Sequence, residues 1–428
     1  MAKPVVVVGA GLAGLVCARK LHEAGIPVLV VDADDRPGGR LKTDKVDGFL
    51  LDRGFQVLFT AYPNAQRELD FKALNFKAFR KGAYIFHGGK LALLEPQSYM
   101  DMLRDRFAMV RDKTIPLHDK RLLGKFDGAV GGLTQRQAYN RDPQTAEDYL
   151  RAFGFGEEII DRFFRPFLGG VFLDHSLSFD SRQLEFVWSM MSQGQTVLPA
   201  QGMQAVPDQI AAGIPRYLFR LGNRVSEVLR AANGVPTGVR FDTSEVLEAS
   251  DVVIATEADI AAKLANQPTA EGHKSSTTLY FETGTPAVDG PYLALNGSGS
   301  GIVNHVAPIS SVAHTYAPPD KHLASVTLIG NPPGSDMELA EIVKMELNSW
   351  FPAKGTYMWR FIRTYRVRFA QMAQPVGFAE HLPGNATNHD GLYWAGEFTE
   401  NSSIDGAIRS GLECAHRLVQ DREASEAA

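Results

Sequence analysis

The sequence predicts an α/β fold in which a Rossmann-like domain with a parallel sheet is joined to a discontinuous α+β domain containing a mixed sheet and a helical layer. Residues 5–8 are four consecutive valines, the composition of a parallel strand buried on both faces. An amphipathic run then reaches Gly25, and a second apolar strand covers residues 27–32. Similar apolar strands recur at 251–256 and 391–397, which indicates that distant segments return to one sheet.

A glycine motif separates the first strand from the first helix. Gly9 allows a tight turn, Gly11 lets the backbone approach a pyrophosphate, and Gly14 lets the helix pack closely on the strand. The N–H groups and the dipole at the helix start attract phosphate. A carboxylate 18 residues past Gly14, at the end of the second strand, is placed to accept hydrogen bonds from a ribose. We therefore predict a dinucleotide site that includes Gly9, Gly11, Leu12, Ala13, Gly14, Asp32 and Ala33.

An Arg-x-Gly-Gly-Arg loop over residues 36–40 decides which dinucleotide is expected. The loop places a guanidinium and two glycines, whose backbone is conformationally free, where a second pyrophosphate contact is needed. A solvated turn is the alternative interpretation. With residues 51–56, it resembles the FAD-binding signature of the flavin amine oxidase, protoporphyrinogen oxidase and phytoene desaturase superfamily. The resemblance implies that FAD contacts Gly38, Gly39, Arg40, Gly54, Phe55 and Gln56.

A strand ending in Gly and Glu, followed by a helix that starts near residues 401–411, resembles the second flavin fingerprint of this superfamily. The resemblance implies that the acid binds a ribityl hydroxyl and that the helix start faces the flavin ring, where its dipole stabilises negative charge formed on reduction. It also implies that the backbone of Val225 contacts adenine, although a plain strand valine is equally consistent. The implied contacts are Val225, Gly396, Glu397, Gly406, Ala407 and Ile408.

Length and composition limit the number of domains, the partners and the cofactors that are expected. At 428 residues two domains are expected, and a net charge of −5 offers no basic field for nucleic acid. Cys17 and Cys414 fall in predicted helices and are expected to be small core residues of a protein in a reducing compartment. No cysteine lies near Phe369 or Gln371, or just before Gly406, so the FAD is expected to be non-covalent. The eleven histidines show no metal-ligand spacing, and no metal is expected.

The expected domains are discontinuous. The FAD-binding domain comprises residues 1–62, 196–265 and 386–428, and the substrate domain comprises 63–195 and 266–385. The first strand starts too early for a secretory signal, and no apolar stretch approaches 18 residues. We therefore expect a cytoplasmic protein, and the sequence does not indicate its oligomeric state.

The remaining elements follow from local patterns. A glycine turn predicts a hairpin over 79–94, helical character covers 96–192, and a mixed sheet with one covering helix spans 275–370. Alternation over 359–369 breaks at Ile362 and Arg363, which predicts a bulge or bend. The other expected elements are helices at 157–164 and 182–191, a helix from Ser335 to Trp350, and strands at 217–221, 225–229, 237–241, 276–281, 303–311 and 323–329.

The middle of the chain is dense in phenylalanine, which allows two interpretations. These side chains either build the core of the helical layer or line a pocket for a long apolar or aromatic substrate. An apolar rim would also let the protein sit against a membrane and take substrate from it. The residues are Phe153, Phe155, Phe163, Phe164, Phe167, Phe172, Phe179 and Phe186.

Three functions remain open. The first is an FAD-dependent dehydrogenase or desaturase that transfers a hydride from a hydrophobic substrate to the flavin. The second is an amine oxidase, but those enzymes place a Tyr where Ser403 stands and commonly a Lys in a strand that Lys274 only precedes. The third is a polyene isomerase or a protein that uses FAD structurally. No catalytic acid or base is assigned, because Gln56, Tyr365 and Glu400 either face the flavin or serve as structural hydrogen-bonding groups.

Overall fold

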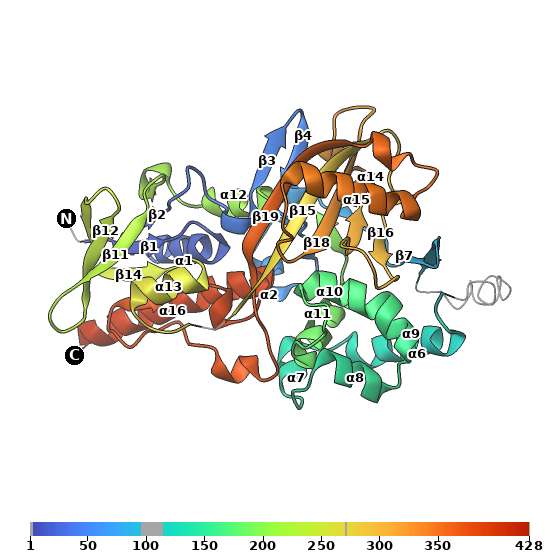
Figure 1. The fold of residues 1–428 in the computed structure, drawn as a ribbon. Helices are drawn as coiled ribbons and strands as arrows, with labels where there is room; N and C mark the ends of the chain where they lie inside the picture. Colours follow the sequence, from blue (N-terminus) through green and yellow to red (C-terminus); the bar gives the residue numbers. More distant parts are fainter. Residues whose placement is uncertain (1–2, 96–113, 270–271, 428) are drawn as a thin grey trace.

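Figure 1 shows the fold as a computed structural model, in which residues 3–95, 114–269 and 272–427 are described. The parallel sheet with helices α1 and α16 lies at one end of the molecule, together with both termini. A large mixed sheet lies at the other end, and a layer of helices from the middle of the chain lies beneath it. The predicted α/β class, with its Rossmann-like part, mixed sheet and helical layer, is confirmed. The domain boundaries stay predictions, and residues 96–113 of the expected helical segment lie outside the described residues.

The parallel sheet gathers strands from both ends of the chain. The four valines of the first strand are fully or almost fully buried, as their composition predicted. Helices α1 (Leu12–Glu23) and α16 (Ile404–Ala427) pack together so closely that a Cβ at Gly411 would lie 2.4 Å from the Ala13 carbonyl oxygen. In spatial order the strands are β10 (Phe219–Arg220), β2 (Val28–Val31), β1 (Val5–Val8), β14 (Asp251–Ile254) and β20 (Leu392–Trp394).

Smaller sheets and helices surround the parallel sheet. The Asn233-Gly234 turn joins two antiparallel strands as predicted, with Gly234 at a φ of 88°. The strand expected at 217–221 is shorter, because residues 216–218 form a 3₁₀ turn. These elements are β11 (Val225–Arg230), β12 (Pro236–Phe241), β13 (Val246–Glu248), β3 (Thr43–Val46), β4 (Phe49–Asp52), β5 (Leu58–Phe59), β6 (Lys77–Ala78), β9 (Thr196–Leu198), α2 (Pro63–Glu68), α3 (Phe71–Leu74), α12 (Ala205–Ala211) and α13 (Ala258–Ala265).

The large sheet carries the predicted bulge. Tyr280 pairs with Arg363 and Phe281 with Phe361, so Ile362 is the extra residue. The strand expected over 303–311 is wrong beyond Ala307, because Pro308 has no N–H for the ladder and a short helix follows. Across the sheet the strands are β19 (Arg360–Met372), β15 (His273–Thr283), β18 (His322–Ile329), β17 (His305–Ala307), β16 (Leu293–Asn296), β7 (Ala83–His87) and β8 (Lys90–Leu94). Nearby helices are α14 (Ile309–Val312) and α15 (Asp336–Trp350).

The helical layer is built around Phe126, whose ring contacts the rings of Phe153, Phe155, Phe164 and Trp188. The helix expected at 157–164 is longer than predicted and changes to a π-helix over Ile160–Phe164. Pro166 has no N–H to donate to the carbonyl four residues earlier, which disfavours a regular α-helix there. The helices are α6 (Leu117–Val130), α7 (Gln135–Tyr139), α8 (Ala146–Phe153), α9 (Glu157–Ile159), α10 (Arg165–Phe172) and α11 (Ser181–Gln193).

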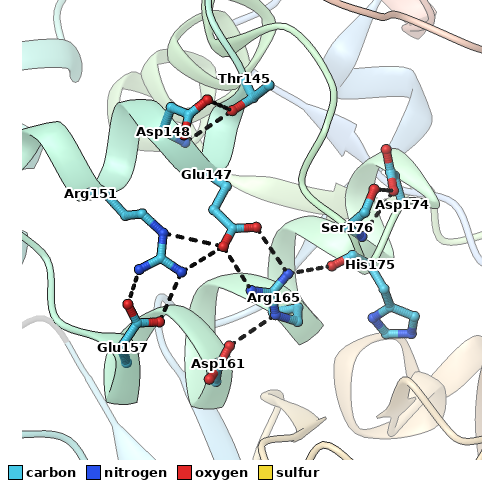
Figure 2. A network of polar contacts seen from close by, with 10 residues as sticks. All are labelled: Thr145, Glu147, Asp148, Arg151, Glu157, Asp161, Arg165, Asp174, His175 and Ser176. Atoms are coloured by element: carbon cyan, nitrogen blue, oxygen red, sulfur yellow. Dashed lines mark hydrogen bonds and ion pairs between the residues drawn. The ribbon is translucent and has the colours of Figure 1, made fainter.

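Two ion-pair networks hold this layer, and they differ in burial. Figure 2 shows the outer network, in which Arg151 binds Glu147 at 2.6 Å and also pairs with Glu157. The Arg151 side chain is 38% exposed and Glu157 is 65% exposed. The inner network is buried: the Arg182 side chain is 2% exposed and bonds Asp180, which is fully buried, at 2.7 Å. Surface pairs contribute little stability, whereas breaking a buried pair is costly.

Cys17 and Cys414 are free and buried in the packed helices α1 and α16. Contact with Cys17, together with burial, raises the pKa of the Cys414 thiol. The prediction that both are small core residues is confirmed, and packing brings together two residues that are far apart in the sequence.

Asp52 makes stability depend on pH. It is 3% exposed and accepts hydrogen bonds from Thr43 Oγ1 at 2.5 Å, from the Met203 N–H at 3.0 Å and from Tyr316 OH at 3.0 Å. Burial is the largest influence, and it raises the Asp52 pKa to about 6 from an ordinary value of 3.8. The folded protein therefore holds a proton that the unfolded chain has lost, so this stabilising contribution disappears as the pH rises from about 4 through about 6.

We expect Asp52→Asn to remove this pH dependence. Between pH 4 and pH 7, the free energy of unfolding of the variant should rise by up to roughly 3 kcal/mol relative to that of the wild type. The figure follows from about 1.36 kcal/mol for each pKa unit by which folding shifts Asp52. Urea unfolding at a series of pH values measures the difference, and the exposed Asp35→Asn serves as the control. A difference between wild type and Asp52→Asn that stays constant with pH would contradict the assignment.

Candidate functional site

A cavity of about 1540 Å³ lies where the carboxyl ends of the parallel strands face the large sheet and the helical layer. This edge is where ligands bind in open α/β sheets. The cavity is lined by residues from both ends of the chain and from its middle. Among the residues expected from sequence to bind the cofactor, those on its wall are Gly9, Gly11, Leu12, Ala13, Asp32, Gly38, Gly39, Arg40, Gly54, Phe55, Gln56, Gly396, Glu397 and Ala407.

The N-terminus of helix α1 faces the cavity and has the geometry of an anion-binding site. Gly11 is its N-cap, no side chain caps the helix, and its first turn holds no acidic residue. A Cβ at Gly11 would meet nothing within 4 Å, whereas one at Gly9, whose φ is 114°, would lie 2.4 Å from the Ala255 carbonyl oxygen. Asp32 accepts hydrogen bonds from the Ala10 N–H at 2.6 Å and the Asp34 N–H at 2.8 Å, which fixes its carboxylate beside this turn.

Arg40 and Glu397 meet across the cavity wall. Arg40 Nη1 donates to Glu397 Oε1 at 2.6 Å and to the Ala370 carbonyl at 2.8 Å. Gln56 Nε2 donates to the Arg40 carbonyl at 2.7 Å, so the loop at 54–56 supports the loop at 36–40. Arg36 turns away instead and pairs with Asp44 at 2.6 Å. One guanidinium of the Arg-x-Gly-Gly-Arg motif therefore faces the cavity.

The start of helix α16 also reaches the cavity. Ser403 Oγ accepts the Gly406 N–H at 2.8 Å, in the manner of an N-cap serine. Ser402 Oγ donates to Glu397 Oε2, which ties the helix start to the acid of the same fingerprint. Ile404 and Ala407 lie on the cavity wall, so the positive end of the helix dipole points into it.

Several predicted residues stand behind the wall. A Cβ at Gly14 would lie 2.0 Å from the Gly9 carbonyl oxygen, and one at Gly406 would lie 2.4 Å from the Asn401 carbonyl oxygen, so both permit close packing. Ile408 is fully buried in the main core. Val225 is buried in a second core cluster, and Ala33 is exposed on the surface.

The cavity wall also contains residues that the sequence did not predict. Arg224 lines the cavity in place of its neighbour Val225, and Thr256 and Glu257 follow strand β14 into it. Asp34 also lines it and pairs with Lys42, whose side chain is 1% exposed. No motif marks these residues, although Thr256 ends an apolar strand at the edge where sites in α/β sheets form. His305 and Thr327, which lie on the large sheet, carried no sequence signal either.

The phenylalanines of the middle segment divide between the two predicted roles. Phe163, Phe167 and Phe172 line the cavity together with Trp188. Phe155, Phe164, Phe179 and Phe186 are buried in the core, and Phe153 is packed against it. The far part of the cavity is therefore largely apolar and aromatic, which suits an apolar ligand.

The lysine that would suit an amine oxidase is engaged elsewhere. The expectation that Lys274 only precedes the strand is wrong, because β15 begins at His273 and Lys274 pairs with Gln371 of β19. Its side chain pairs with Asp174 at 3.3 Å and is not on the cavity wall, where β15 presents Ser276 and Thr278. Tyr365 donates to Asp44 at 2.9 Å, away from the wall. Glu400 also lies outside the wall, and burial raises its pKa to about 7. Of the three residues considered as facing the flavin, Gln56 lies on the cavity wall.

Two kinds of feature are absent from the described residues. In residues 3–95, 114–269 and 272–427, no three His, Cys, Asp or Glu side chains are grouped so that they could hold a metal ion. Within the same ranges, none of the helices combines the length and the apolar character needed to cross a bilayer.

Comparisons with known proteins place this architecture. The 15-cis-phytoene desaturase of Glycine max is 22% identical over 468 residues, covering 98% of this chain and 80% of that protein. Protoporphyrinogen oxidase 2 of Arabidopsis thaliana is 30% identical over 172 residues, covering 39% of this chain and 32% of that protein. Among solved structures, cyclohexylamine oxidase from Brevibacterium oxydans IH-35A has a TM-score of 0.71 at 16% identity. The match covers 99% of this chain and all of that chain, so the two proteins share the fold.

The family described as flavin containing amine oxidoreductase matches residues 12–419. The match runs from the first helix, beside the glycine turn, through the aromatic middle segment to the final helix. Because it spans nearly the whole sequence, the chain belongs to the flavin-containing amine oxidoreductase family and is a flavin-dependent oxidoreductase.

Proposed function

We propose that this chain is an FAD-dependent dehydrogenase that removes a hydride from a C–H bond of an apolar substrate, as a desaturase or a porphyrinogen oxidase does. One observation carries the proposal: the residues of the flavin motifs and the aromatic side chains of the helical layer line the same cavity. A cofactor at one end and an apolar molecule at the other would thus share one continuous space, as hydride transfer between them requires.

The cavity fits FAD at its nucleotide end. The uncapped start of α1 and the open space beside Gly11 would hold the pyrophosphate, and Asp32 would accept hydrogen bonds from the adenosine ribose. Glu397, fixed by Arg40 and Ser402, would accept a hydrogen bond from the ribityl chain. No cysteine is found among the described residues of the cavity wall, which supports non-covalent binding.

When bound, FAD supplies the hydride acceptor. The chain's own residues would do the rest. The α16 start, next to Ala407, would stabilise negative charge at the reacting end of the cavity. Phe163, Phe167 and Trp188 would hold an apolar substrate and keep water away from the transfer.

The same wall favours a C–H donor over an amine. Lys274 is engaged by Asp174 outside the cavity, and Ser403 caps α16 where amine oxidases place an aromatic cage residue. The 15-cis-phytoene desaturase of Glycine max, which matches 98% of this chain at 22% identity, supports a C–H donor.

Anaerobic bleaching of the flavin tests the proposal. The purified yellow protein would be mixed separately with phytoene, protoporphyrinogen and putrescine, and the visible flavin absorbance would be followed. We expect phytoene or protoporphyrinogen to bleach the flavin and putrescine to leave it oxidised. Faster bleaching by putrescine would overturn the proposal in favour of amine oxidation. An isomerised polyene formed without net flavin reduction would favour an isomerase, and a colourless protein that takes up no FAD would refute the proposal.

A further inference from the structure

A row of polar side chains crosses the large sheet on the face that lines the cavity. Thr278 on β15 is paired directly with Thr327 on β18, and Thr327 is paired with His305 on β17. Residues directly opposite one another in neighbouring strands point to the same face of a sheet. All three line the cavity, so the apolar substrate space has one polar stripe on its sheet side.

Hydrogen bonds define which nitrogen of His305 carries the proton. Asn304 Nδ2 lies 3.1 Å from the Pro166 carbonyl oxygen and 2.8 Å from His305 Nδ1. The carbonyl can only accept, so the Asn304 atom between these two groups must be the amide nitrogen, and its second hydrogen points at Nδ1. Nδ1 is therefore the acceptor and Nε2 carries the hydrogen. Burial lowers the pKa of His305 to about 4, so the ring is neutral at pH 7.

Two donors of this stripe have no protein partner. His305 Nε2 and Thr327 Oγ1 are buried and accept or donate no hydrogen bond within the described residues. Both residues are 3% exposed. The His305 ring packs against the Phe55 ring in a T-shaped arrangement, with ring centres 5.0 Å apart. Buried polar atoms are nearly always hydrogen-bonded in folded proteins, so a fixed, buried N–H beside a hydroxyl indicates a place for a ligand acceptor.

We propose that His305 and Thr327 bind an uncharged oxygen atom, a carbonyl or hydroxyl, of an otherwise apolar substrate. The inference rests on the proposed function and names its substrate class. Burial is the sole cause of the lowered His305 pKa, with no contribution from a charged group. A carboxylate would therefore lack a countercharge at this position. An alkylammonium group has no lone pair for the Nε2 hydrogen. A pure hydrocarbon such as phytoene can still occupy the cavity, but it leaves both donors unsatisfied and should bind more weakly than an oxygen-bearing molecule of the same shape.

Two probes of nearly equal shape test the assignment. Methyl naphthyl ketone and isopropenylnaphthalene differ by a carbonyl oxygen in place of a methylene group, and equilibrium dialysis against the flavin-loaded protein measures the affinity of each. We expect the ketone to bind about tenfold more tightly than the alkene. Thr327→Val should reduce this preference to about threefold or less and leave alkene affinity nearly unchanged. The matched variant Thr327→Ser, which keeps the hydroxyl, should retain most of the preference.

A spectroscopic measurement follows the proton itself. In ¹⁵N-histidine-labelled flavin-loaded protein, the His305 signal, assigned through a His305→Gln variant, should show an Nε2–H tautomer. That signal should shift on addition of the ketone and not of the alkene. Equal binding of the two probes, or a His305 signal that responds identically to both, would overturn the inference while leaving the proposed function standing. Failure of both probes to bind would count against the proposed function too, because it assigns the cavity to apolar molecules.

Discussion

Replacing Gly11 by alanine should leave the protein folded and remove most of its FAD. The Gly11 backbone has a φ of −73°, which alanine adopts freely, and a Cβ there would meet no protein atom within 4 Å. The new methyl group would instead occupy the space at the α1 start that we assign to the pyrophosphate. We expect the FAD dissociation constant to rise about 100-fold, equivalent to about 2.7 kcal/mol. Quenching of FAD fluorescence on titration with apoprotein measures the change.

Two companion variants make this result interpretable. Gly14→Ala would force a Cβ within 2.0 Å of the Gly9 carbonyl oxygen, so it should lower the melting temperature of the apoprotein as well as lose FAD. Gly128→Ala, on an exposed part of α6 where a Cβ meets nothing within 4 Å, should leave FAD affinity unchanged and should not lower the melting temperature, because alanine favours a helix more than glycine does. Wild-type FAD affinity in Gly11→Ala would refute the placement of the pyrophosphate at this helix.

Replacing Arg182 by methionine should destabilise the protein far more than deleting an exposed charge. Asp180 is fully buried and depends on the Arg182 guanidinium at 2.7 Å, along with the N–H groups of Arg182 and Gly377 at 2.9 Å. Removing the guanidinium would leave a buried carboxylate without its countercharge, at a cost of about 3–5 kcal/mol. The loss should appear as a lower midpoint of urea unfolding. The substitution would also break the ion pair between Arg182 and Glu380, which joins α11 to the segment that contains Glu380.

The outer network of Figure 2 supplies the control. Arg151→Met breaks the pairs with Glu147 and Glu157, but both partners reach solvent, so the expected cost is about 1 kcal/mol or less. The double variant Asp180→Asn with Arg182→Met should recover part of the stability lost in Arg182→Met, because no charge is then buried alone. Equal costs for Arg151→Met and Arg182→Met would contradict the role assigned to burial.

The parts of the site that sequence could predict are those set by local backbone requirements. Gly9, Gly11 and Gly14 belong to one turn, and their spacing alone indicates how a helix must start and pack. Contacts between segments that lie far apart in the sequence could not be predicted in this way. The bond between Arg40 and Glu397 joins residues 357 positions apart, and no local pattern shows that they meet.

Burial and register account for the other limits. The phenylalanines of 153–186 all suit a core, and which of them face the cavity depends on how each helix rotates against its neighbours. His305 follows a strand pattern without any motif. Its importance comes from pairing with Thr327 across two strands and from the contact of Asn304 with Pro166, neither of which has a local signature. The expected strand over 303–311 failed at Pro308 for a local reason that the sequence did contain.

The order of strands in the parallel sheet has a consequence for synthesis on the ribosome. Strand β1 emerges first, yet its neighbour β14 is made some 240 residues later, and β20 and the α16 start follow near residues 392–407. The glycine turn would therefore exist long before the acid and helix start that complete the nucleotide pocket. Nascent chains stopped before Glu397 should bind FAD poorly, so acquisition of the cofactor belongs to the end of translation or after it. Until then, the apolar wall of the cavity would depend on chaperones or on rapid local packing of the helical layer for protection from aggregation.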